Sequence, residues 1–594
     1  MKTFKKLFYL LTPFERKRAL LLLIIIIIMA LLDMIGVASI LPFMAVLTNP
    51  SLVETNFILK QTFQAFKIFG VENEQQFIFA LGVLVFSLLI ISLTFKAFAS
   101  YLQTRFVQMC EYSIAKRLLE GYLYQPYGWF LSRNSADIGK TILSVIDQVI
   151  GNGINPFMEL ISKGIVTIAL ITLLVIADPT LTLIVSFSLG GAYGIIFYIL
   201  KRYINRIGSE RLKNNQIRFT TVSEAFGAIK ELKLGSLEET YIKLFSNSAQ
   251  IYARSQANLV AISQLPRFII EIIAFGGILL MILYLISYTG NFNQSLPIIS
   301  LYVFAGYRLM PALQQIYSSF TQITFVNASL NELYNDLKKL KPFKVNRDNS
   351  EISFNEKISL KNVNYNYPNS SRTALKDINL NIFANSTVGL VGVTGSGKTT
   401  VVDIILGLLE PKKGTLEVDG KIITKYNSRN WQQSIGYVPQ HIFLADNTIE
   451  SNIAFGVDLK NINQEAVEKG SKIANLHNFV MDELPNQYQT MIGERGIRLS
   501  GGQRQRIGIA RALYHNPKIL IFDEATSALD NQTEKAVMDA VNNLSKDITI
   551  ILIAHRLNTV KNCDLILKFE KGQIISQGTF EELLEKSDNF NPTI

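Results

Sequence analysis

The segment Gly392-Val-Thr-Gly-Ser-Gly-Lys-Thr399 decides the fold of the C-terminal half of this 594-residue chain. It follows residues 387–391, whose β-branched composition predicts a buried strand, and it precedes residues 400–409, which have a helical pattern. A strand, the spacing GxxxxGK[ST] and a helix, in this order, are typical of a loop that binds nucleotide phosphates. The glycines let backbone N–H groups converge on phosphate oxygens, and the start of the helix adds partial positive charge.

The side chains of this loop have separate expected roles. The Lys398 ammonium should reach the β- and γ-phosphates, and the Thr399 hydroxyl should bind Mg²⁺. The residues expected to surround the phosphates are Gly392, Val393, Thr394, Gly395, Ser396, Gly397, Lys398, Thr399 and Thr400.

Two carboxylates end another apolar run further along the chain. Residues 518–522 predict a buried strand, and Asp523 and Glu524 follow at its end. This position places Asp523 beside the Mg²⁺ and leaves Glu524 to polarise the attacking water.

A third motif, Ser500-Gly-Gly-Gln503, lies between the first two and precedes a helical segment. Its glycines at a helix start predict a second anion site, with an ordinary glycine turn as the alternative. Short apolar strands alternate with helices across residues 351–594, which predicts an α/β domain with a largely parallel sheet.

The N-terminal half has the composition of a membrane domain. A spanning helix needs about 20 mostly apolar residues. Six such runs predict an all-α transmembrane domain over residues 1–337, at about 19–45, 77–100, 155–177, 180–200, 268–288 and 296–320. The charged, proline-containing stretch 338–350 is the expected linker. The chain is therefore predicted to be a multi-domain membrane protein, with a six-helix transmembrane domain followed by an α/β P-loop ATPase domain.

Charge is concentrated in the same half. Residues 1–340 carry 29 Lys and Arg against 19 Asp and Glu, so most of the net charge of +11 lies there. Basic residues gather before the first run and after the fourth, whereas residues 178–179 and 289–295 contain none. The positive-inside rule then places both termini in the cytoplasm. Because the basic residues are interleaved with membrane runs, we expect contact with membrane lipids and no nucleic-acid partner.

The connection between the first two runs is longer than a turn requires. Within it Phe57, Phe63 and Phe66 fall near helical spacing. Two interpretations stay open: an amphipathic helix at the outer membrane interface, or a loop packed against neighbouring runs.

The motifs together resemble the nucleotide-binding domain of an ATP-binding cassette (ABC) transporter, over roughly residues 351–580. The resemblance implies ATP hydrolysis coupled to transport, with ATP and Mg²⁺ as cofactors. It implies that Tyr367 stacks on adenine, that Gln440 joins Thr399 and Asp523 at the Mg²⁺, and that His555 contacts the γ-phosphate. Catalysis would then involve Glu524, His555, Lys398 and Gln440.

The same resemblance implies a dimer. Ser500, Gly502 and Gln503 match the signature motif, which in this family contacts ATP held by the other subunit, and residues 527–530 match the loop along the dimer seam. The chain has one phosphate loop and one signature motif, so a single copy cannot close a site. We expect a homodimer.

The cargo must be inferred from charges at membrane depth. Lys96, Arg267 and Arg308 lie in or near the second, fifth and sixth runs, and a basic belt of this kind suits a phosphate or pyrophosphate group. The alternatives are that Arg267 pairs with Glu271, that Glu159 pairs with Lys163, and that Lys96 reaches toward the interface.

Across both of its halves, the chain also resembles the bacterial flippases for lipid-linked oligosaccharides used in protein glycosylation. The residues that carry this likeness are Leu265-Pro-Arg267 with Glu271, Tyr307-Arg-Leu-Met-Pro311, and Asp33 with Pro42-Phe43. The likeness implies that the substrate is an anionic polyprenyl-pyrophosphate-linked oligosaccharide. The transporter would turn it from the cytoplasmic to the outer leaflet of the bacterial inner membrane. A lipid, multidrug or peptide exporter, and an ATP-gated channel or regulator, are the alternatives.

Overall fold

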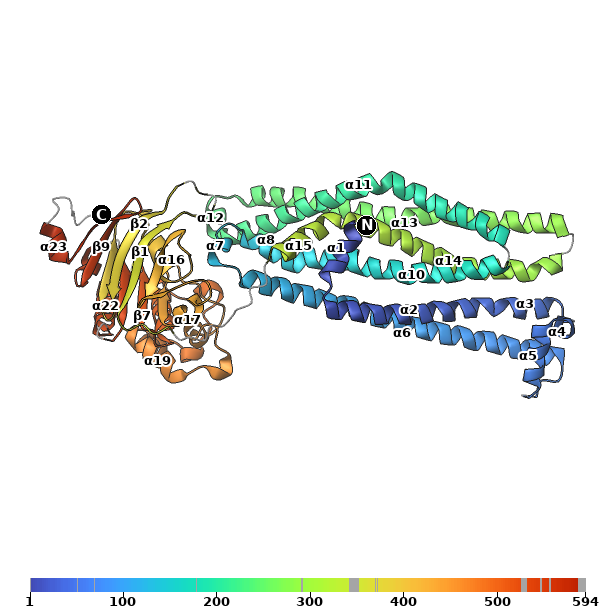
Figure 1. The fold of residues 1–594 in the computed structure, drawn as a ribbon, viewed down its shortest axis with the longest axis horizontal. Coiled ribbons are helices and arrows are strands. Elements are labelled where there is room, and N and C mark those ends of the chain that lie inside the picture. The colour runs from blue at the N-terminus through green and yellow to red at the C-terminus, as the bar shows by residue number, and fades with distance from the viewer. Residues whose placement is uncertain are drawn as a thin grey trace. The chain divides into compact units, whose positions relative to one another are not determined.

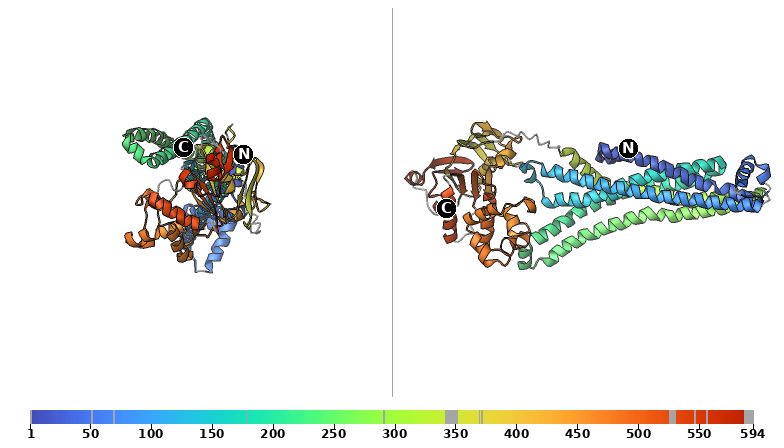
Figure 2. Two further views of the ribbon diagram at one scale, coloured as in Figure 1. Left: turned by 90° about the vertical axis from the view of Figure 1, so that its left-hand side faces the viewer. Right: turned by 90° about the horizontal axis from the view of Figure 1, so that it is seen from below.

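A computed structural model describes residues 2–50, 52–68, 70–177, 179–289, 292–340, 352–368, 370, 372–524, 531–544, 547–554 and 557–585. The chain divides into two compact units, Met1–Gln125 with Arg133–Phe343 and Pro126–Ser132 with Lys344–Ile594. The first unit is helical, and the second is built around β-sheets (Figures 1 and 2). The predicted fold class, a helical domain followed by an α/β domain, is confirmed.

The first unit consists of long helices and short connecting ones. They are α1 (Lys2–Leu10), α2 (Pro13–Ala38), α3 (Ile40–Thr48), α4 (Leu52–Thr55), α5 (Phe57–Lys67), α6 (Glu74–Leu123), α8 (Ser135–Lys140), α9 (Ile146–Val149), α10 (Asn155–Ala177), α11 (Pro179–Gly227), α12 (Ile229–Leu234), α13 (Glu238–Thr289), α14 (Phe292–Phe325) and α15 (Asn327–Lys339). Two π-helical turns, Thr141–Val145 and Ile150–Ile154, flank α9. Helix α11 packs along α13, α10 along α14, and α2 along α6.

Helices α6, α11 and α13 are far longer than a membrane is thick. They contain 50, 49 and 52 residues. At about 1.5 Å per residue each is roughly 75 Å long, against about 30 Å for the hydrocarbon core of a bilayer. Each of them is therefore long enough to continue well beyond the membrane.

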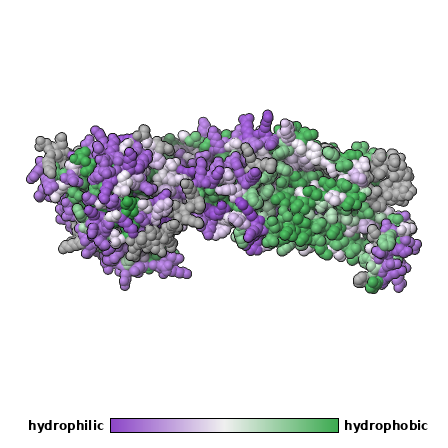
Figure 3. Space-filling view, in the orientation of Figure 1, coloured by the Kyte–Doolittle hydropathy of each residue, from purple (hydrophilic) through white to green (hydrophobic). Residues whose placement is uncertain are grey.

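The apolar surface of this unit fits a membrane environment. Figure 3 shows a broad hydrophobic surface with hydrophilic side chains at either end. Among the described residues, Pro13–Thr48, Glu74–Leu123, Ser135–Ala177 and Thr182–Gly227 are long and apolar enough to cross a bilayer. The fifth and sixth expected spans fall on α13 and α14, which border residues outside the described ranges, so the six spans stay a prediction.

Local signals explain where the first helices begin and end. Thr12 caps α2 in a reciprocal capping box with Glu15, and Pro13 occupies the first turn. The first expected span is two helices, because α2 ends at Ala38 and α3 begins at Ile40.

The connection before α6 forms a helix that packs on the unit. In α5, Phe63 and Phe66 lie edge-on against Phe77 of α6, with ring centroids 5.1 and 5.9 Å apart. Phe57, at the start of α5, is 73% exposed. The segment is therefore a helix, and one of its faces packs against a neighbouring helix as the second interpretation expects; its place at the outer membrane interface stays a prediction.

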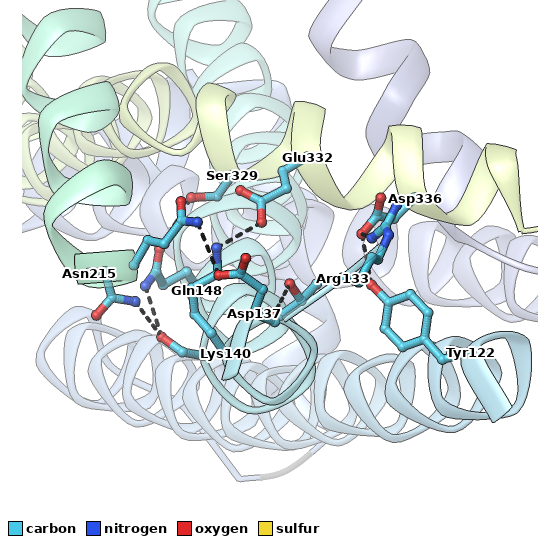
Figure 4. Close-up of polar contacts among 12 residues, drawn as sticks. Tyr122, Arg133, Asp137, Lys140, Gln148, Asn215, Ser329, Glu332 and Asp336 are labelled. Carbon is cyan, nitrogen blue, oxygen red and sulfur yellow. Dashed lines mark hydrogen bonds and ion pairs between the residues drawn. The ribbon is translucent and has the colours of Figure 1, made fainter. Parts of the chain in front are cut away.

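Polar side chains hold α15 to its unit (Figure 4). Ser329, Glu332 and Asp336 are three and four residues apart and share one face of the helix. Their contacts are Ser329 Oγ to Gln148 Oε1 (3.2 Å), Glu332 Oε1 to Lys140 Nζ (3.0 Å) and Asp336 Oδ2 to the Tyr122 hydroxyl (2.7 Å). The Lys140 side chain is only 3% exposed, so its charge depends on Glu332 for a partner.

The second unit contains two sheets. Its described strands are β1 (Lys357–Tyr365), β2 (Leu375–Phe383), β3 (Thr387–Val391), β4 (Lys413–Val418), β5 (Lys421–Ile422), β6 (Ile435–Val438), β7 (Ile519–Asp523), β8 (Thr549–Ile553), β9 (Leu565–Glu570) and β10 (Gln573–Gly578). Its described α-helices are α7 (Tyr127–Phe130), α16 (Lys398–Ile405), α17 (Ser428–Gln432), α18 (Ile449–Ile453), α19 (Gln464–Ile473), α20 (His477–Glu483), α21 (Gly501–Leu513), α22 (Asn531–Leu544) and α23 (Phe580–Glu585).

The larger sheet positions the functional residues. Its strand order is β10-β9-β3-β8-β7-β6, and all neighbours are parallel except β10 with β9. Every residue of β3, β7 and β8 is buried, because apolar clusters cover both faces of the sheet. The sequence did not predict the second sheet, which is antiparallel with the order β2-β1-β4-β5.

A close helix contact in the first unit gives a stability prediction. A Cβ atom on Gly208 of α11 would lie 2.1 Å from the backbone oxygen of Phe325 in α14. Gly208→Ala should therefore force the helices apart and lower the free energy of unfolding by about 1–3 kcal/mol. Gly194→Ala on the same helix, where nothing lies within 4 Å, should be neutral or stabilising. Thermal unfolding of the two purified variants would test this, and equal melting temperatures would contradict it.

Candidate nucleotide-binding site

The predicted phosphate loop lies between the end of β3 and the start of α16. Strand β3 runs between β8 and β9, so the loop emerges from the centre of the sheet. Gly392 has a φ of 147°, and a Cβ atom there would lie 2.3 Å from the Phe569 carbonyl oxygen. Gly397 has a φ of 108°, and a Cβ atom there would lie 2.9 Å from the Leu375 side chain. Both positions therefore require glycine.

Lys398 folds back over this loop. The side chain is buried, and its Nζ donates to the carbonyl oxygens of Gly392 and Val393 at 2.6 and 3.2 Å. Burial lowers the pKa of Lys398, while the charges of Glu524 and Asp523 act in the opposite direction. The buried Ser396 hydroxyl has no hydrogen-bond partner among the residues that the structure describes. A bound phosphate would give both groups an anionic partner.

A cavity opens in front of the loop. Tyr367 lies at its wall, and its hydroxyl is 2.9 Å from the Thr400 hydroxyl. The lining residues are Tyr367, Ser370, Arg372, Thr373, Ala374, Gly395, Gly397, Lys398, Thr399, Thr400, Lys571 and Gly572. Sequence reasoning missed half of them, because no motif marks them: Ser370, Arg372, Thr373, Ala374, Lys571 and Gly572. The turn between β9 and β10 reaches the loop through the Gly572 N–H, which donates to the Ser396 carbonyl at 2.9 Å.

The two predicted carboxylates lie at the same edge of the sheet as the loop. Asp523 is the last residue of β7 and is buried, with 6% of its surface exposed. Glu524 follows with a φ of 51°, a left-handed conformation that costs a non-glycine residue about 1–2 kcal/mol. The Gln440 side chain, just after β6, donates through Nε2 to Glu524 Oε2 at 2.7 Å. Three residues that the sequence predicts for one site are thus brought together.

The available donors fit Mg²⁺ held jointly with a nucleotide. Mg²⁺ prefers hard oxygen ligands and is often bound by one or two carboxylates with substrate phosphates. Thr399 supplies a hydroxyl at the start of α16, and Asp523 supplies a carboxylate. Among the described residues there is no cluster of three or more His, Cys, Asp or Glu that could hold a metal on its own.

The Ser500 motif forms a helix cap. Ser500 precedes α21, its hydroxyl accepts from the Gln503 N–H at 3.2 Å, and Gln503 Oε1 accepts from the Ser500 N–H at 2.8 Å. The S-x-x-Q spacing is the sequence signature of such a capping box, so this helix cap can be predicted from the sequence. Ser500, Gly502 and Gln503 do not line the cavity described above. His555 and residues 527–530 lie outside the described residues.

Comparison with known proteins decides the family. The ABC transporter family matches residues 375–527. Over 482 residues the chain is 31% identical to the ATP-dependent lipid A-core flippase of Saccharophagus degradans, with 80% of each protein covered. This chain belongs to the ABC transporter family.

Further relatives show which kind of ABC transporter it is. The chain is 29% identical to the alpha-hemolysin translocation ATP-binding protein HlyB of Proteus vulgaris, over 84% of this chain and 70% of that protein. The structure of a bacterial Atm1-family ABC exporter with ATP bound shares the fold, with a TM-score of 0.77, 21% identity and 96% of both chains covered. The protein is an exporter-type ABC half-transporter, a membrane protein that couples ATP hydrolysis to transport.

In the membrane half of this ABC transporter, two of the three predicted substrate cations are already paired. Arg267 Nε lies 2.6 Å from Glu271 Oε1, so the local pairing offered as an alternative is confirmed. Arg308 Nη1 lies 2.7 Å from Asp33 Oδ1. Sequence reasoning noted Asp33 but did not predict this pair.

The remaining cation, Lys96 of α6, lies near a second lysine. Lys163 of α10 interacts electrostatically with Lys96, and also with the carboxylates of Glu159 and Asp33. Glu159, offered as an alternative partner of Lys163, thus acts on it, and it also accepts a hydrogen bond from Gln315 of α14. The two lysines therefore belong to one charged group that also contains both carboxylates, a feature that the sequence spacing does not reveal.

Near the nucleotide site of the ABC transporter, Asp403 of α16 should make the stability of the protein depend on pH. Burial and, second, the charge of Asp523 raise the pKa of Asp403 to about 6. The stability that its protonated form contributes is therefore lost as the pH rises through about 6. Asp403→Asn should raise the apparent Tm above pH 6 in EDTA without nucleotide, and this advantage should shrink toward pH 5.

Thermal melts between pH 5 and 8 would measure the effect. Asp482→Asn, at an exposed position of α20, is the matched control and should shift the Tm equally at every pH. Parallel pH profiles for Asp403→Asn and the unmodified protein would contradict the prediction.

Proposed function

We propose that this ABC half-transporter forms a homodimer that uses ATP and Mg²⁺ to flip an anionic, lipid-linked substrate from the cytoplasmic to the outer leaflet of the bacterial inner membrane. The cargo that fits best is a polyprenyl-pyrophosphate-linked oligosaccharide. The observation that carries the ATP-driven part is the meeting of Lys398, Asp523 and Glu524 at one edge of the sheet.

Each residue of the site has a role on this proposal. Lys398 holds the β- and γ-phosphates, and Tyr367 stacks on the adenine. Thr399, Asp523 and Gln440 hold Mg²⁺, which neutralises charge on the phosphates when it is bound. Glu524 orients and polarises the attacking water. His555 is assigned to the γ-phosphate on its sequence position alone.

The assignment of Gln440 uses both ends of its amide. Nε2 donates to Glu524 Oε2 at 2.7 Å, which leaves the carbonyl oxygen Oε1 to bind a metal beside Asp523. One side chain would then hold the metal and orient the general base at the same time.

The arrangement of the signature motif supports the homodimer. The backbone N–H groups at the start of α21 form a site for an anion, yet Ser500, Gly502 and Gln503 do not line the cavity of their own chain. A second copy would bring its signature motif to this cavity, and two identical chains would form two complete sites.

The choice of an anionic lipid rests on charges in the membrane helices. An unpaired charge at the bilayer centre costs about 2.5–3.5 kcal/mol on insertion scales, so intramembrane cations mark functional sites. Lys96 and Lys163 interact electrostatically, together with Glu159 and Asp33, and a phosphate or pyrophosphate would add negative charge beside both lysines. Arg308 can join such a site if the substrate competes with Asp33 for its guanidinium. The similarity to a lipid A-core flippase also supports an anionic lipid cargo.

The topology follows from charge. The basic clusters before α2 and within α11 suit the cytoplasmic side, which places both termini there. The long continuations of α6, α11 and α13 would then be cytoplasmic and would carry motion from the ATPase domains to the membrane.

Replacement of the general base is the first test. Glu524→Gln should lower ATP hydrolysis by about 100-fold or more, because the amide cannot accept a proton, while ATP binding should persist. ATPase assays and size analysis in detergent with ATP would show an inactive, ATP-bound dimer. Turnover at the wild-type rate would remove Glu524 from the catalytic role, and a monomer with ATP bound would contradict the dimer.

The second test asks whether Arg308 binds the substrate or only forms an ion pair with Asp33. Arg308→Ala and Lys96→Ala should each lower ATP-dependent flipping of a polyprenyl-pyrophosphate-linked oligosaccharide in proteoliposomes by roughly tenfold, the value of one charge-assisted contact. Asp33→Asn is the matched control, because it leaves Arg308 in place and removes its partner. Transport should survive this control.

Equal losses for Arg308→Ala and Asp33→Asn would show that the arginine is structural. Undiminished flipping by both Ala variants would remove the anion site. Equal transport of an uncharged lipid would favour a general lipid exporter.

A further inference from the structure

A tyrosine outside every recognised motif contacts the proposed magnesium ligand. The Tyr437 hydroxyl donates to Asp523 Oδ2 at 3.2 Å. Tyr437 is the third residue of β6 and Asp523 is the last residue of β7, so the bond joins neighbouring strands of the parallel sheet.

The register of these strands explains why the two side chains meet. Tyr437 pairs with Ile521, and side chains two residues apart on a strand point to the same face. Ile519 and Ile521 belong to the apolar cluster on one face, together with Tyr437, whereas Val438, Leu520 and Phe522 belong to the cluster on the other. Asp523 therefore continues the face that carries Tyr437. The long Tyr437 side chain therefore brings its hydroxyl to the carboxylate of the shorter Asp523 side chain.

The phenol is suited to donate at this point. It keeps its proton at physiological pH, so the Tyr437 hydroxyl donates and the Asp523 carboxylate accepts. A hydrogen bond to a charged group is worth more than one between neutral groups, typically about 1.5–3 kcal/mol. The bond thus holds the Asp523 carboxylate in one orientation.

We propose that Tyr437 is a positioning residue that orients the Asp523 carboxylate for the Mg²⁺ that accompanies ATP. This inference rests on the proposed role of Asp523 as a magnesium ligand. Hydrogen bonds that orient metal ligands commonly change metal affinity by about 10–100-fold when they are removed. The hydroxyl would act on the metal through Asp523 and touch neither the nucleotide nor the water. Strand β6 and its following loop would then serve both carboxylates, Tyr437 for Asp523 and Gln440 for Glu524.

The test compares nucleotide binding with and without the metal in the full-length, detergent-purified transporter. The probe is a fluorescent, non-hydrolysable ATP analogue, titrated in EDTA and across a range of Mg²⁺ concentrations. In Tyr437→Phe the affinity in EDTA should match that of the unmodified protein. The gain in affinity on adding Mg²⁺ should fall about tenfold, and half-saturation should need more Mg²⁺.

A matched control separates this effect from a general loss of stability. Tyr488 is buried, whereas Tyr437 is partly buried, and the Tyr488 hydroxyl lies 2.8 Å from Nδ1 of His477. Tyr488→Phe removes a hydroxyl of the same kind and should leave the Mg²⁺ dependence unchanged. An unaltered Mg²⁺ gain in Tyr437→Phe, or an equal loss of affinity in EDTA and in Mg²⁺, would overturn the inference.

Asp523→Asn distinguishes failure of the inference from failure of the proposed function. A retained Mg²⁺ gain in Asp523→Asn would show that Asp523 is not the magnesium ligand, and both assignments would fall. If the Mg²⁺-dependent gain in nucleotide affinity is lost in Asp523→Asn and kept in Tyr437→Phe, only the role of Tyr437 is overturned.

Discussion

The ATPase unit depends on the close approach of its phosphate loop to the strands around it. At Gly392 the loop backbone lies so near the Phe569 carbonyl that a Cβ atom would be 2.3 Å from it, and Gly572 donates a backbone hydrogen bond to Ser396. Protein contacts therefore help to hold the loop in this shape, which lowers the free energy that nucleotide binding must supply to order it. Because β3, β6, β7 and β8 are parallel, their ends meet at one edge, which fixes where the loop, Gln440 and Asp523 lie.

The sequence predicted those parts of the site that are encoded by local spacing. The phosphate loop, the carboxylates at the end of β7 and the glycines at the start of α21 each lie within a short segment whose backbone form follows from its residues. Contacts between distant segments could not be predicted this way. The bond from Tyr437 to Asp523 joins residues 86 positions apart and requires the register of two strands. Arg372 and Lys571 reach the cavity from turns without a motif, and the antiparallel sheet likewise depends on pairing between distant strands.

The same distinction applies to charges in the helical unit. The pair of Arg267 and Glu271 follows from helical spacing, whereas Arg308 and Asp33 are 275 residues apart and meet only because α2 and α14 belong to one bundle. Partners matter here because an isolated charge is expensive in a bilayer. A count of cations in membrane runs therefore overstates the basic surface that a substrate can meet. In this protein the pairing shifts attention from Arg267 to Lys96 and its neighbour Lys163.

Strain and hydrogen bonding at Glu524 bear on how the general base is held. Its left-handed backbone, with φ of 51°, is retained only because the surrounding structure holds it, and strain of this kind gathers at functional sites. The Gln440 amide donates to the same side chain through Nε2 at 2.7 Å. On the proposed assignment the carbonyl oxygen at the other end of this amide binds a metal beside Asp523. One glutamine then connects the general base to the metal, so a metal that arrives with its nucleotide would fix the Glu524 carboxylate through this amide. The position of the base would therefore depend on the ligand that makes attack by water useful.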